Sequence, residues 1–177
     1  MNVPVLETER LILREYRLAD FPFHAAIWAH PRTTRDFGGY VFDEENCWLR
    51  FMRNWGQWEL FGYGLWALEH KEGGNYSGAV GFIQARRTMN IPYRDAPEAA
   101  WMVAPDLHGQ GLAREAMTAA LGWADAHVEA PQTWCMINPE NQISQKVASR
   151  FGYARAQDGT YKDKPMLTFL RSRGGGA

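Results

Sequence analysis

Cysteine is scarce in this chain, and long hydrophobic runs are absent. The 177 residues include two cysteines, Cys47 and Cys135, which are too few and too far apart for a disulfide framework. We expect both to be buried free thiols, as in a reducing compartment. No segment approaches the roughly 18 apolar residues of a membrane span, and the first residues carry charges where a signal peptide is apolar. These absences predict a cytoplasmic protein with no membrane partner.

The chain also lacks a charge excess of either sign. It has 19 Lys and Arg residues against 20 Asp and Glu residues, a formal net charge of −1, without a block of like charge. A dedicated nucleic-acid binder usually carries a basic stripe, so we expect no nucleic-acid partner. The five histidines show no metal-ligand spacing, so we expect no metal site.

Internal repeats are absent as well, and low complexity is confined to the glycines of residues 174–176. The length suits one globular domain, and a hydrophobic content of 46% with 22% charged residues excludes a disordered chain. We therefore expect a single domain over residues 1–173, followed by a flexible tail over residues 174–177.

The first half of the chain predicts a strand, two helices and a hairpin. Residues 10–16 alternate between apolar and polar side chains, which indicates a strand. A short helix follows and ends before Pro31, and a second helix begins around Asp43. Residues 64–70 and 77–84 are expected to pair as a hairpin across a glycine-containing turn.

The second half alternates strands with helices. One helix starts in a glycine loop and runs to about His127, and another ends at Phe151 and Gly152, where glycine suits the end of a helix. Strands are expected over residues 98–104, 133–137, 153–157 and 166–170. This order predicts an α+β (mixed α/β) fold around one sheet.

The glycine loop between the strand 98–104 and its following helix has two interpretations. Gly109 and Gly111 let the backbone approach an anion, which the N–H groups and the helix dipole would hold. The other interpretation is a tight strand-to-helix turn. The loop is no P-loop, because no Gly-Lys-Ser/Thr follows, and no dinucleotide fingerprint, because Glu115 occupies the third glycine position.

Three motifs in order carry a resemblance to a known family. They are LETERLILR at residues 6–14, EAAWMVAPDLHGQG at residues 98–111 and NPENQISQKVASRFGY at residues 138–153. The chain resembles the GNAT N-acetyltransferase superfamily, above all its RimJ/RimL-like branch, the ribosomal-protein N-terminal acetyltransferase type. His108 stands where the family's loop motif has Gln or Arg. The likeness covers most of residues 5–170.

The resemblance implies a GNAT-like fold with acetyl-CoA as cosubstrate. In that fold a single central, mostly antiparallel sheet of six or seven strands is splayed at the cofactor site and flanked by about four helices. Acetyl-CoA would lie across the splay between the strands at 98–104 and 133–137. Its pantetheine arm would pair with the main chain of Trp101, Met102 and Val103, like an added strand.

The family likeness assigns further residues to the cofactor. The pyrophosphate would lie on the glycine loop, which comprises His108, Gly109, Gln110, Gly111, Leu112, Ala113 and Arg114. The side chains of Asn138 and Asn141 would bond the pantetheine arm. Asn141 also suits a plain helix N-cap, and the two roles can coexist.

Acetyl transfer to an amine needs a neutral nucleophile, a polarised thioester carbonyl and a proton for the departing thiolate. A main-chain N–H near Met102 or Val103 would polarise the carbonyl. Glu98 is the candidate base, acting through water, and its alternative is a surface glutamate on an edge strand. Ser144 is the candidate acid, and its alternative is a first-turn serine that bonds the backbone. Tyr153 and Tyr161 are reserve candidates for the acid.

Protonation favours an α-amine as acceptor. At pH 7.5 about a third of α-amino groups are neutral, against about one lysine amine in a thousand. We therefore expect the N-terminal α-amine of a protein or peptide. The alternatives are a small-molecule or amino-acid-like amine, and a non-catalytic acyl-CoA-binding module that would need neither Glu98 nor Ser144. The net basic loops at 31–39 and 86–96 argue against a polycation and for an acceptor that carries a carboxylate.

The acceptor side is expected to come from the first half of the chain, which holds five of the eight tryptophans. We assign Phe37, Trp66 and Arg86 to acceptor binding. Helix-spaced tryptophans more often form a core, and burial is expected for Trp123 and Trp134. The excess of tryptophan still suggests an aromatic acceptor groove or a dimer surface, so the protein is expected to be a monomer or a homodimer.

Overall fold

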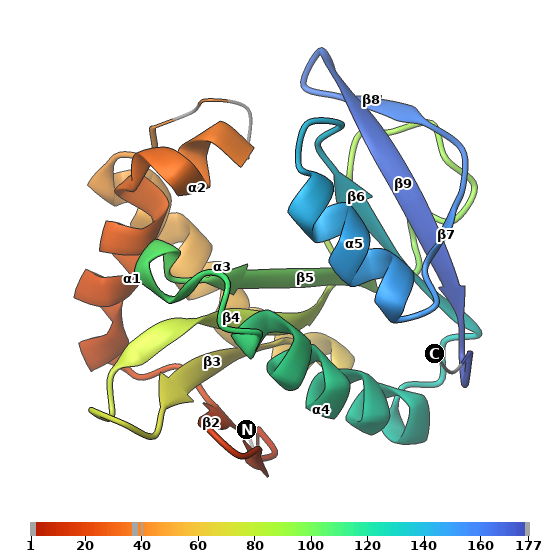
Figure 1. The fold of residues 1–177 in the computed structure, drawn as a ribbon. Coiled ribbons are helices and arrows are strands. Elements are labelled where there is room, and N and C mark those ends of the chain that lie inside the picture. The colour runs from red at the N-terminus through yellow and green to blue at the C-terminus, as the bar shows by residue number, and fades with distance from the viewer. Residues whose placement is uncertain (1–2, 37–38, 40, 176–177) are drawn as a thin grey trace.

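A computed structural model describes residues 3–36, 39 and 41–175, which form one open sheet flanked by helices (Figure 1). The strands are β1 Leu6–Glu7, β2 Leu11–Arg14, β3 Leu65–His70, β4 Tyr76–Ile83, β5 Glu98–Val103, β6 Gln132–Ile137, β7 Ala154–Arg155, β8 Gly159–Tyr161 and β9 Lys164–Ser172. The helices are α1 Phe21–Ala29, α2 Pro31–Asp36, α3 Glu44–Phe61, α4 Leu112–His127 and α5 Gln142–Arg150. Short 3-10 turns occupy Leu18–Asp20 and Pro105–Leu107.

The sheet runs in the order β1-β2-β3-β4-β5-β6-β9-β7, with β8 paired to β9. Every pair is antiparallel except β5 with β6, so the predicted single, mostly antiparallel sheet is confirmed. The described residues contain nine strands rather than six or seven, because β1, β7 and β8 have only two or three residues each. Alternation cannot be recognised over so short a length.

The fifth helix, α2, lies where a loop was expected. The sequence predicts that the first helix ends before Pro31. In the structure Pro31 is also the first residue of the next helix, α2. Proline is tolerated in the first helical turn, because the N–H that it lacks would have no partner there. The prediction of an irregular segment from residue 31 is therefore wrong for Pro31–Asp36.

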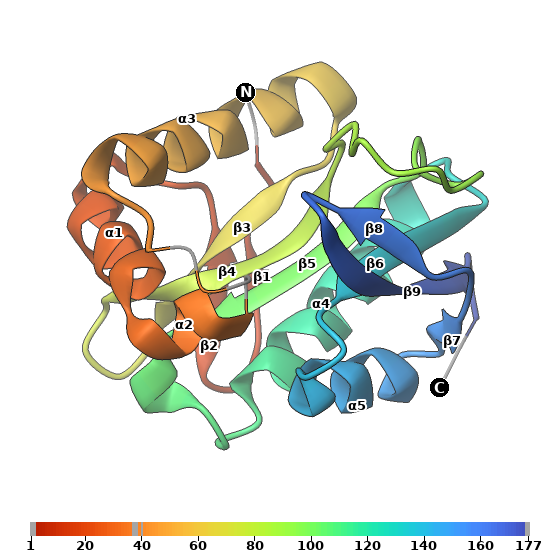
Figure 2. The same cartoon turned by 90° about the horizontal axis from the view of Figure 1, so that it is seen from above.

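Helices cover both faces of the sheet (Figure 2). The core cluster on one face joins α4 to the sheet through side chains such as Met117, Val80 and Phe82. On the other face α1 and α3 contribute Ile27 and Phe51 to a second cluster. Side chains of β5 therefore alternate between an α4 side and an α1–α3 side.

The strands β5 and β6 separate soon after they meet. Their pairing is parallel and consists of one register pair, Glu98 with Trp134. The N–H of Trp134 also donates to the carbonyl of Pro97 at 3.1 Å, just before β5 begins. Beyond this point the two strands diverge, with α4 and α5 beside the gap (Figure 1). The expected splay between these two strands is present, and we call it the β5–β6 opening.

Both cysteines are free and buried, as the sequence predicts. Two residues of the expected tail form hydrogen bonds: the N–H of Gly174 donates to Asp125 at 3.3 Å and that of Gly175 to Ser172. Arg171 of β9 also forms a two-bond ion pair with Asp125 on α4. Residues 174 and 175 therefore belong to the described fold, and residues 176–177 of the expected tail lie outside it.

Candidate active site

The glycine loop presents main-chain donors at the start of α4. Gly109 and Gly111 have φ values of 81° and 79°, a left-handed conformation that favours glycine. No N–H group of residues 109–114 has an acceptor among the described residues. A Cβ placed at Gly109 would meet no atom within 4 Å, so the space beside the loop is open. These features suit an anion on the helix N-terminus.

Side chains on both sides brace this loop. His108 Nε2 donates to the carbonyl of Val103 at 2.9 Å, which ties the loop to the end of β5. Arg10 bonds the carbonyl of Gln110 at 3.0 Å and the carboxylate of Glu115 at 2.7 Å. Burial raises the pKa of Glu115, but the hydrogen bonds that its carboxylate accepts outweigh burial and lower it overall. Glu115 is thus an ionised brace beside the anion site.

Hydrogen bonds at both ends of β5 fix the direction of its main-chain groups. The N–H of Ala104 donates to Ser77 at 2.8 Å, toward β4. The carbonyl of Pro97 accepts from Trp134, toward β6. Because main-chain groups of successive strand residues alternate in direction, even-numbered residues of β5 face β4 and odd-numbered residues face the opening.

This alternation separates the three residues expected to pair with pantetheine. Trp101 and Val103 direct their main-chain groups into the β5–β6 opening, while those of Met102 belong to the ladder with Ala79. The prediction that Met102 pairs with the cofactor is therefore wrong. The carbonyl of Val103 already accepts from His108, which leaves the Val103 N–H and both groups of Trp101 for a ligand.

Side chains of β5 and α5 meet at the opening. The indole N–H of Trp101 donates to Ser144 Oγ at 3.3 Å. The Asn141 side chain accepts from the Ser144 N–H at 2.9 Å, so Asn141 is the N-cap of α5. Asn138 Oδ1 accepts from the N–H of Glu140 in the preceding turn. The structure therefore brings Trp101, Ser144 and Asn141 together.

Glu98 lies on the other face of β5, in a buried ion pair. The residue is 4% exposed, so the alternative of a surface glutamate is wrong. Arg87 donates to both carboxylate oxygens, at 2.8 and 2.9 Å, and to the hydroxyl of Tyr161 at 3.1 Å. Burial lowers the pKa of Arg87, but the charge and hydrogen bonds of Glu98 outweigh burial and raise it overall.

Of the two reserve candidates for the acid, Tyr153 belongs to the core. Its hydroxyl is buried and lies 2.7 Å from Thr133 Oγ1. Burial, the main cause, raises the pKa of Tyr153 above its ordinary range. The hydroxyl of Tyr161, by contrast, lies beside Arg87 on the Glu98 side.

Trp66 is not an acceptor-binding residue, and that assignment is wrong. Its side chain is 0% exposed and packs against Trp58 and Trp123 on the α4 side of the sheet. Its indole N–H donates to the carbonyl of Pro4 at 2.7 Å. The two-residue period of β3 turns Trp66 away from the α1–α3 side, where the acceptor was expected.

Of the other two residues assigned to the acceptor, the structure describes only Arg86. Phe37 lies outside the described residues. Arg86 has a side-chain exposure of 77% and only a distant partner, Asp95 at 4.0 Å. Arg86 is thus a solvated loop residue at the rim of the Glu98 side.

Sequence reasoning missed two arginines on α3. The guanidinium carbon of Arg50 lies 4.3 Å from the ring centre of Trp28 and 4.1 Å from that of Phe42. Burial, together with the charges of Arg53 and Arg87, lowers the pKa of Arg50 to about 10. The apolar spacing of this helix predicted its buried face only. Its polar face has a signal of its own, because Arg50 and Arg53 are three residues apart.

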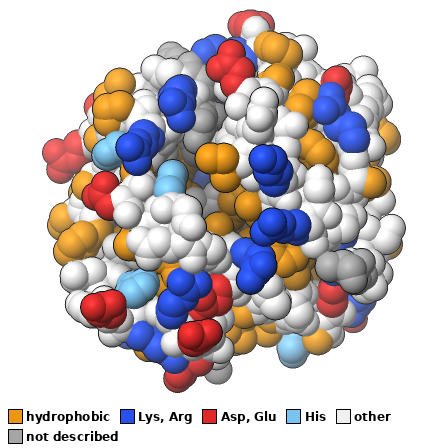
Figure 3. Space-filling view, viewed as in Figure 1, with side chains coloured by type: hydrophobic (Ala, Val, Ile, Leu, Met, Phe, Trp, Pro, Cys, Tyr) orange, Lys and Arg blue, Asp and Glu red, His pale blue; other side chains and the backbone are white. Residues whose placement is uncertain are grey.

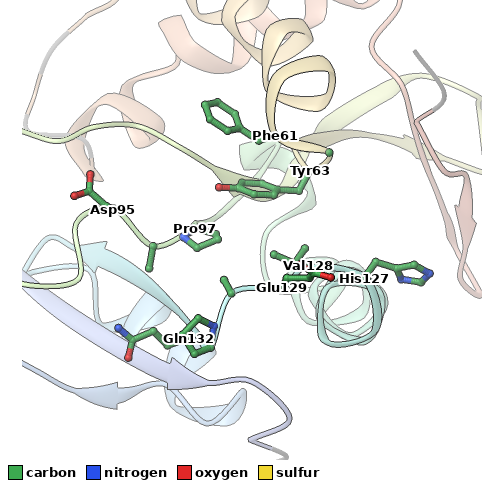
Figure 4. Close-up of a pocket in the computed structure, with 12 residues that line it drawn as sticks. Phe61, Tyr63, Asp95, Pro97, His127, Val128, Glu129 and Gln132 are labelled. Carbon is green, nitrogen blue, oxygen red and sulfur yellow. The ribbon is translucent and has the colours of Figure 1, made fainter.

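A separate cavity of about 600 Å³ lies at the closed end of the β5–β6 pair (Figure 4). Phe61, Tyr63, Pro97, His127 and Gln132 are among its lining residues. It contains no residue expected to bind cofactor or acceptor. Over residues 3–36, 39 and 41–175 there is no helix suited to span a membrane and no cluster of three metal-ligating side chains.

A sheet that opens between two parallel strands, with unpaired N–H groups at a neighbouring helix N-terminus, suits the extended arm and the pyrophosphate of acetyl-CoA. Residues 10–154 match the acetyltransferase (GNAT) domain family. This chain belongs to that family, and as such it transfers acetyl groups from acetyl-CoA to amines.

Solved structures agree with this assignment. A GnaT-family acetyltransferase from Bordetella pertussis is 30% identical, covers 96% of this chain and 100% of its own, and superposes with a TM-score of 0.84. An acetyltransferase from Agrobacterium tumefaciens is 28% identical over 96% of this chain and 95% of its own, with a TM-score of 0.81. RimL, a ribosomal L7/L12 α-N-protein acetyltransferase solved with coenzyme A, shares the fold at 15% identity, a TM-score of 0.73, and 96% and 98% coverage.

Proposed function

We propose that the acceptor is the N-terminal α-amine of a protein or peptide, as in the RimJ/RimL-like branch that the sequence motifs resemble. The observation that carries the proposal is the β5–β6 opening, which has main-chain donors on one side and the ion-paired Glu98 on the other. Acetyl-CoA supplies the acetyl group in activated form, as a thioester.

Main-chain groups would hold most of the cosubstrate. The unpaired N–H groups of residues 109–114 and the open space beside Gly109 fit a pyrophosphate. The main-chain groups of Trp101 would pair with the pantetheine arm as an added strand. The amide groups of Asn138 and Asn141 lie on the facing turn and keep their NH₂ donors available.

Two groups on the α4–α5 side would assist the departing thiolate and the carbonyl. The N–H of Val103 faces the opening and would polarise the thioester carbonyl. Ser144 would donate its hydroxyl proton to the thiolate. Because Trp101 donates to Ser144 Oγ, one lone pair of that oxygen is occupied and the serine O–H remains free to donate elsewhere.

Glu98 would take the proton from the amine through water. Each carboxylate oxygen offers about two acceptor positions, and Arg87 occupies one on each oxygen. A water molecule can therefore bond Glu98 without breaking the ion pair. An α-amine suits this arrangement, because deprotonation at pH 7.5 costs under about 1 kcal/mol, against roughly 4 kcal/mol for lysine.

The test is to incubate the protein with acetyl-CoA and short peptides that differ in their amines. Thiol release and peptide mass are followed for a peptide with a free N-terminus, its N-blocked twin that keeps one lysine, and a twin without lysine. We expect acetylation of both free N-termini and none of the blocked peptide. Acetylation of the lysine alone would refute the acceptor assignment, and binding without turnover would favour an acyl-CoA-binding module.

A further inference from the structure

Arg50 and Arg53 of α3 have no carboxylate partner among the described residues. The guanidinium carbon of Arg50 lies beside the Trp28–Phe42 pair, 4.3 Å from the ring centre of Trp28 and 4.1 Å from that of Phe42, and the two rings are in edge-to-face contact at 5.1 Å. Rings that pack against the faces of a guanidinium leave the N–H groups at its edge available. Those groups form the fork that binds a carboxylate through two hydrogen bonds.

The same arginines lie on the acceptor side of β5. Gln57, one helical turn after Arg53 on α3, accepts from the N–H of Gln84 at 2.7 Å, and Gln84 directly follows Ile83, the β4 partner of Glu98. Arg53 is open to solvent, yet burial lowers its pKa, and both observations fit a side chain on the wall of a concave surface. The face of the molecule that carries α5 has a hollow with Lys and Arg side chains on either side of it (Figure 3), and α3 lies behind this face (Figure 2).

The charges in this region do not balance. Arg87 is neutralised by the two hydrogen bonds that it donates to Glu98. Arg50 and Arg53 then leave two positive charges, and their mutual repulsion contributes to the lowered pKa of Arg50. Like charges held together in a partly desolvated site favour binding of an anion between them.

We propose that Arg50 and Arg53 bind a carboxylate of the acceptor, so that the enzyme selects amines carried on acidic molecules and rejects polyamines. This inference rests on the proposed acetyl transfer and specifies the acceptor further. The carboxylate can come from an acidic side chain near a peptide N-terminus or from the α-carboxylate of a free amino acid. The chemistry that the arginines recognise is the same in both cases.

Two matched acceptor pairs separate these sources. Ala-Asp-Glu-Ala-amide is compared with Ala-Asn-Gln-Ala-amide, and free alanine with alaninamide, by kcat and KM for acetylation. In at least one pair we expect the member with the carboxylate to have the higher kcat/KM, by about tenfold or more, through a lower KM. The first pair reports side-chain carboxylates and the second reports the α-carboxylate.

Variants then assign the preference to the arginines. Arg50→Gln and Arg53→Gln should each reduce it by about tenfold, whereas Arg50→Lys should retain part of it because the charge remains. Arg150→Gln, an exposed arginine at the end of α5, is the matched control and should leave the preference unchanged. Equal rates within both pairs, or a preference that survives both glutamine variants, would overturn the proposal.

A binding measurement keeps this inference distinct from the proposed function. Calorimetry with the CoA-saturated protein measures the same four compounds without turnover. If none is acetylated, the acceptor assignment fails, but a carboxylate-dependent affinity that Arg53→Gln removes still supports the arginine site. If the compounds with and without a carboxylate bind with equal affinity, the arginine site is wrong, whether or not any of them is acetylated.

Discussion

At the residue scale, the Arg87–Glu98 pair links stability to chemistry. Glu98 lies at the start of β5, and the loop before this strand supplies its arginine from residue 87. Side-chain exposures of 15% and 5% mean that either charge alone would be costly to bury. The pair therefore fixes the Glu98 carboxylate in the position from which, in the proposed reaction, it would take a proton through water.

Removing both partners should cost less than the sum of the two single losses. Arg87→Gln leaves a buried carboxylate without its counter-charge, so we expect the free energy of unfolding to fall by about 3–5 kcal/mol. The double variant R87Q/E98Q should lose less than the two single variants combined. Urea denaturation of all four proteins measures this coupling. Additive losses would show that the ion pair contributes nothing to stability.

The buried His24 should make the stability of the protein depend on pH. Burial, together with the charges of Arg50 and Arg53, lowers the pKa of His24 to about 4, against about 6.5 in an unfolded chain. Between these values the unfolded chain binds a proton that the folded chain does not. Stability should therefore fall as the pH drops from about 6.5 to about 4, by about 3 kcal/mol in total.

The measurement is denaturant unfolding at pH 7.0 and 4.5, on the wild type and on His24→Gln. The variant lacks the titrating ring, so its loss of stability over this interval should be smaller. Equal losses in the two proteins would contradict a neutral, buried His24 and assign the pH dependence to other groups.

At the scale of elements, the loop before α4 should depend on its glycines. Gly111 is the left-handed N-cap of α4, whereas Gly122 is an ordinary helical residue with open space around it. Gly111→Ala should strain the loop and weaken CoA binding, and Gly111→Val should abolish it. Gly122→Ala is the matched control, expected to keep CoA affinity and to gain about 0.5–1 kcal/mol in stability. Calorimetry with CoA measures the affinity of each variant, and urea denaturation measures the stability. Unchanged affinity in Gly111→Val would place the cofactor elsewhere.

Local signals made most elements predictable from sequence. The helix expected around Asp43 begins at Glu44 with Asp43 as its N-cap, and it ends at Gly62 with a φ of 69°. Asn141 likewise caps α5. The sequence could not show that the main-chain groups of Met102, unlike those of its neighbours, face β4. Their direction depends on how β5 pairs with β4. Pairing across the sheet, unlike a cap, involves residues distant in the chain.

The candidate site was less predictable, because tertiary contacts decide it. The sequence alone was enough to select Glu98 and Ser144 as candidates. Their orientation was not predictable, because the contact of Arg87 with Glu98 and that of Trp101 with Ser144 each join different elements. Trp66 failed as an acceptor residue because strand period alone does not say which face of a sheet binds substrate. The arginines of α3 follow the polar spacing of that helix, but whether a carboxylate pairs with them depends on the elements that pack beside α3.

At the scale of the whole molecule, the proposed reaction would use both faces of one sheet. The α4 side and α5 provide the amides and the hydroxyl that suit the cosubstrate. The α1–α3 side provides the carboxylate and the arginines that suit the acceptor. Only at the β5–β6 opening can the two meet, since the remaining strands of the described sheet are paired continuously.

The most direct test is turnover with a peptide that has a free N-terminus and acidic second and third residues. Thiol release and the mass of the peptide are followed together, for the wild type and for Gly111→Val. We expect one thiol released per acetyl group found on the α-amine, and no reaction with the variant. If the wild type binds CoA but acetylates no α-amine, or if Gly111→Val reacts equally well, the account is wrong.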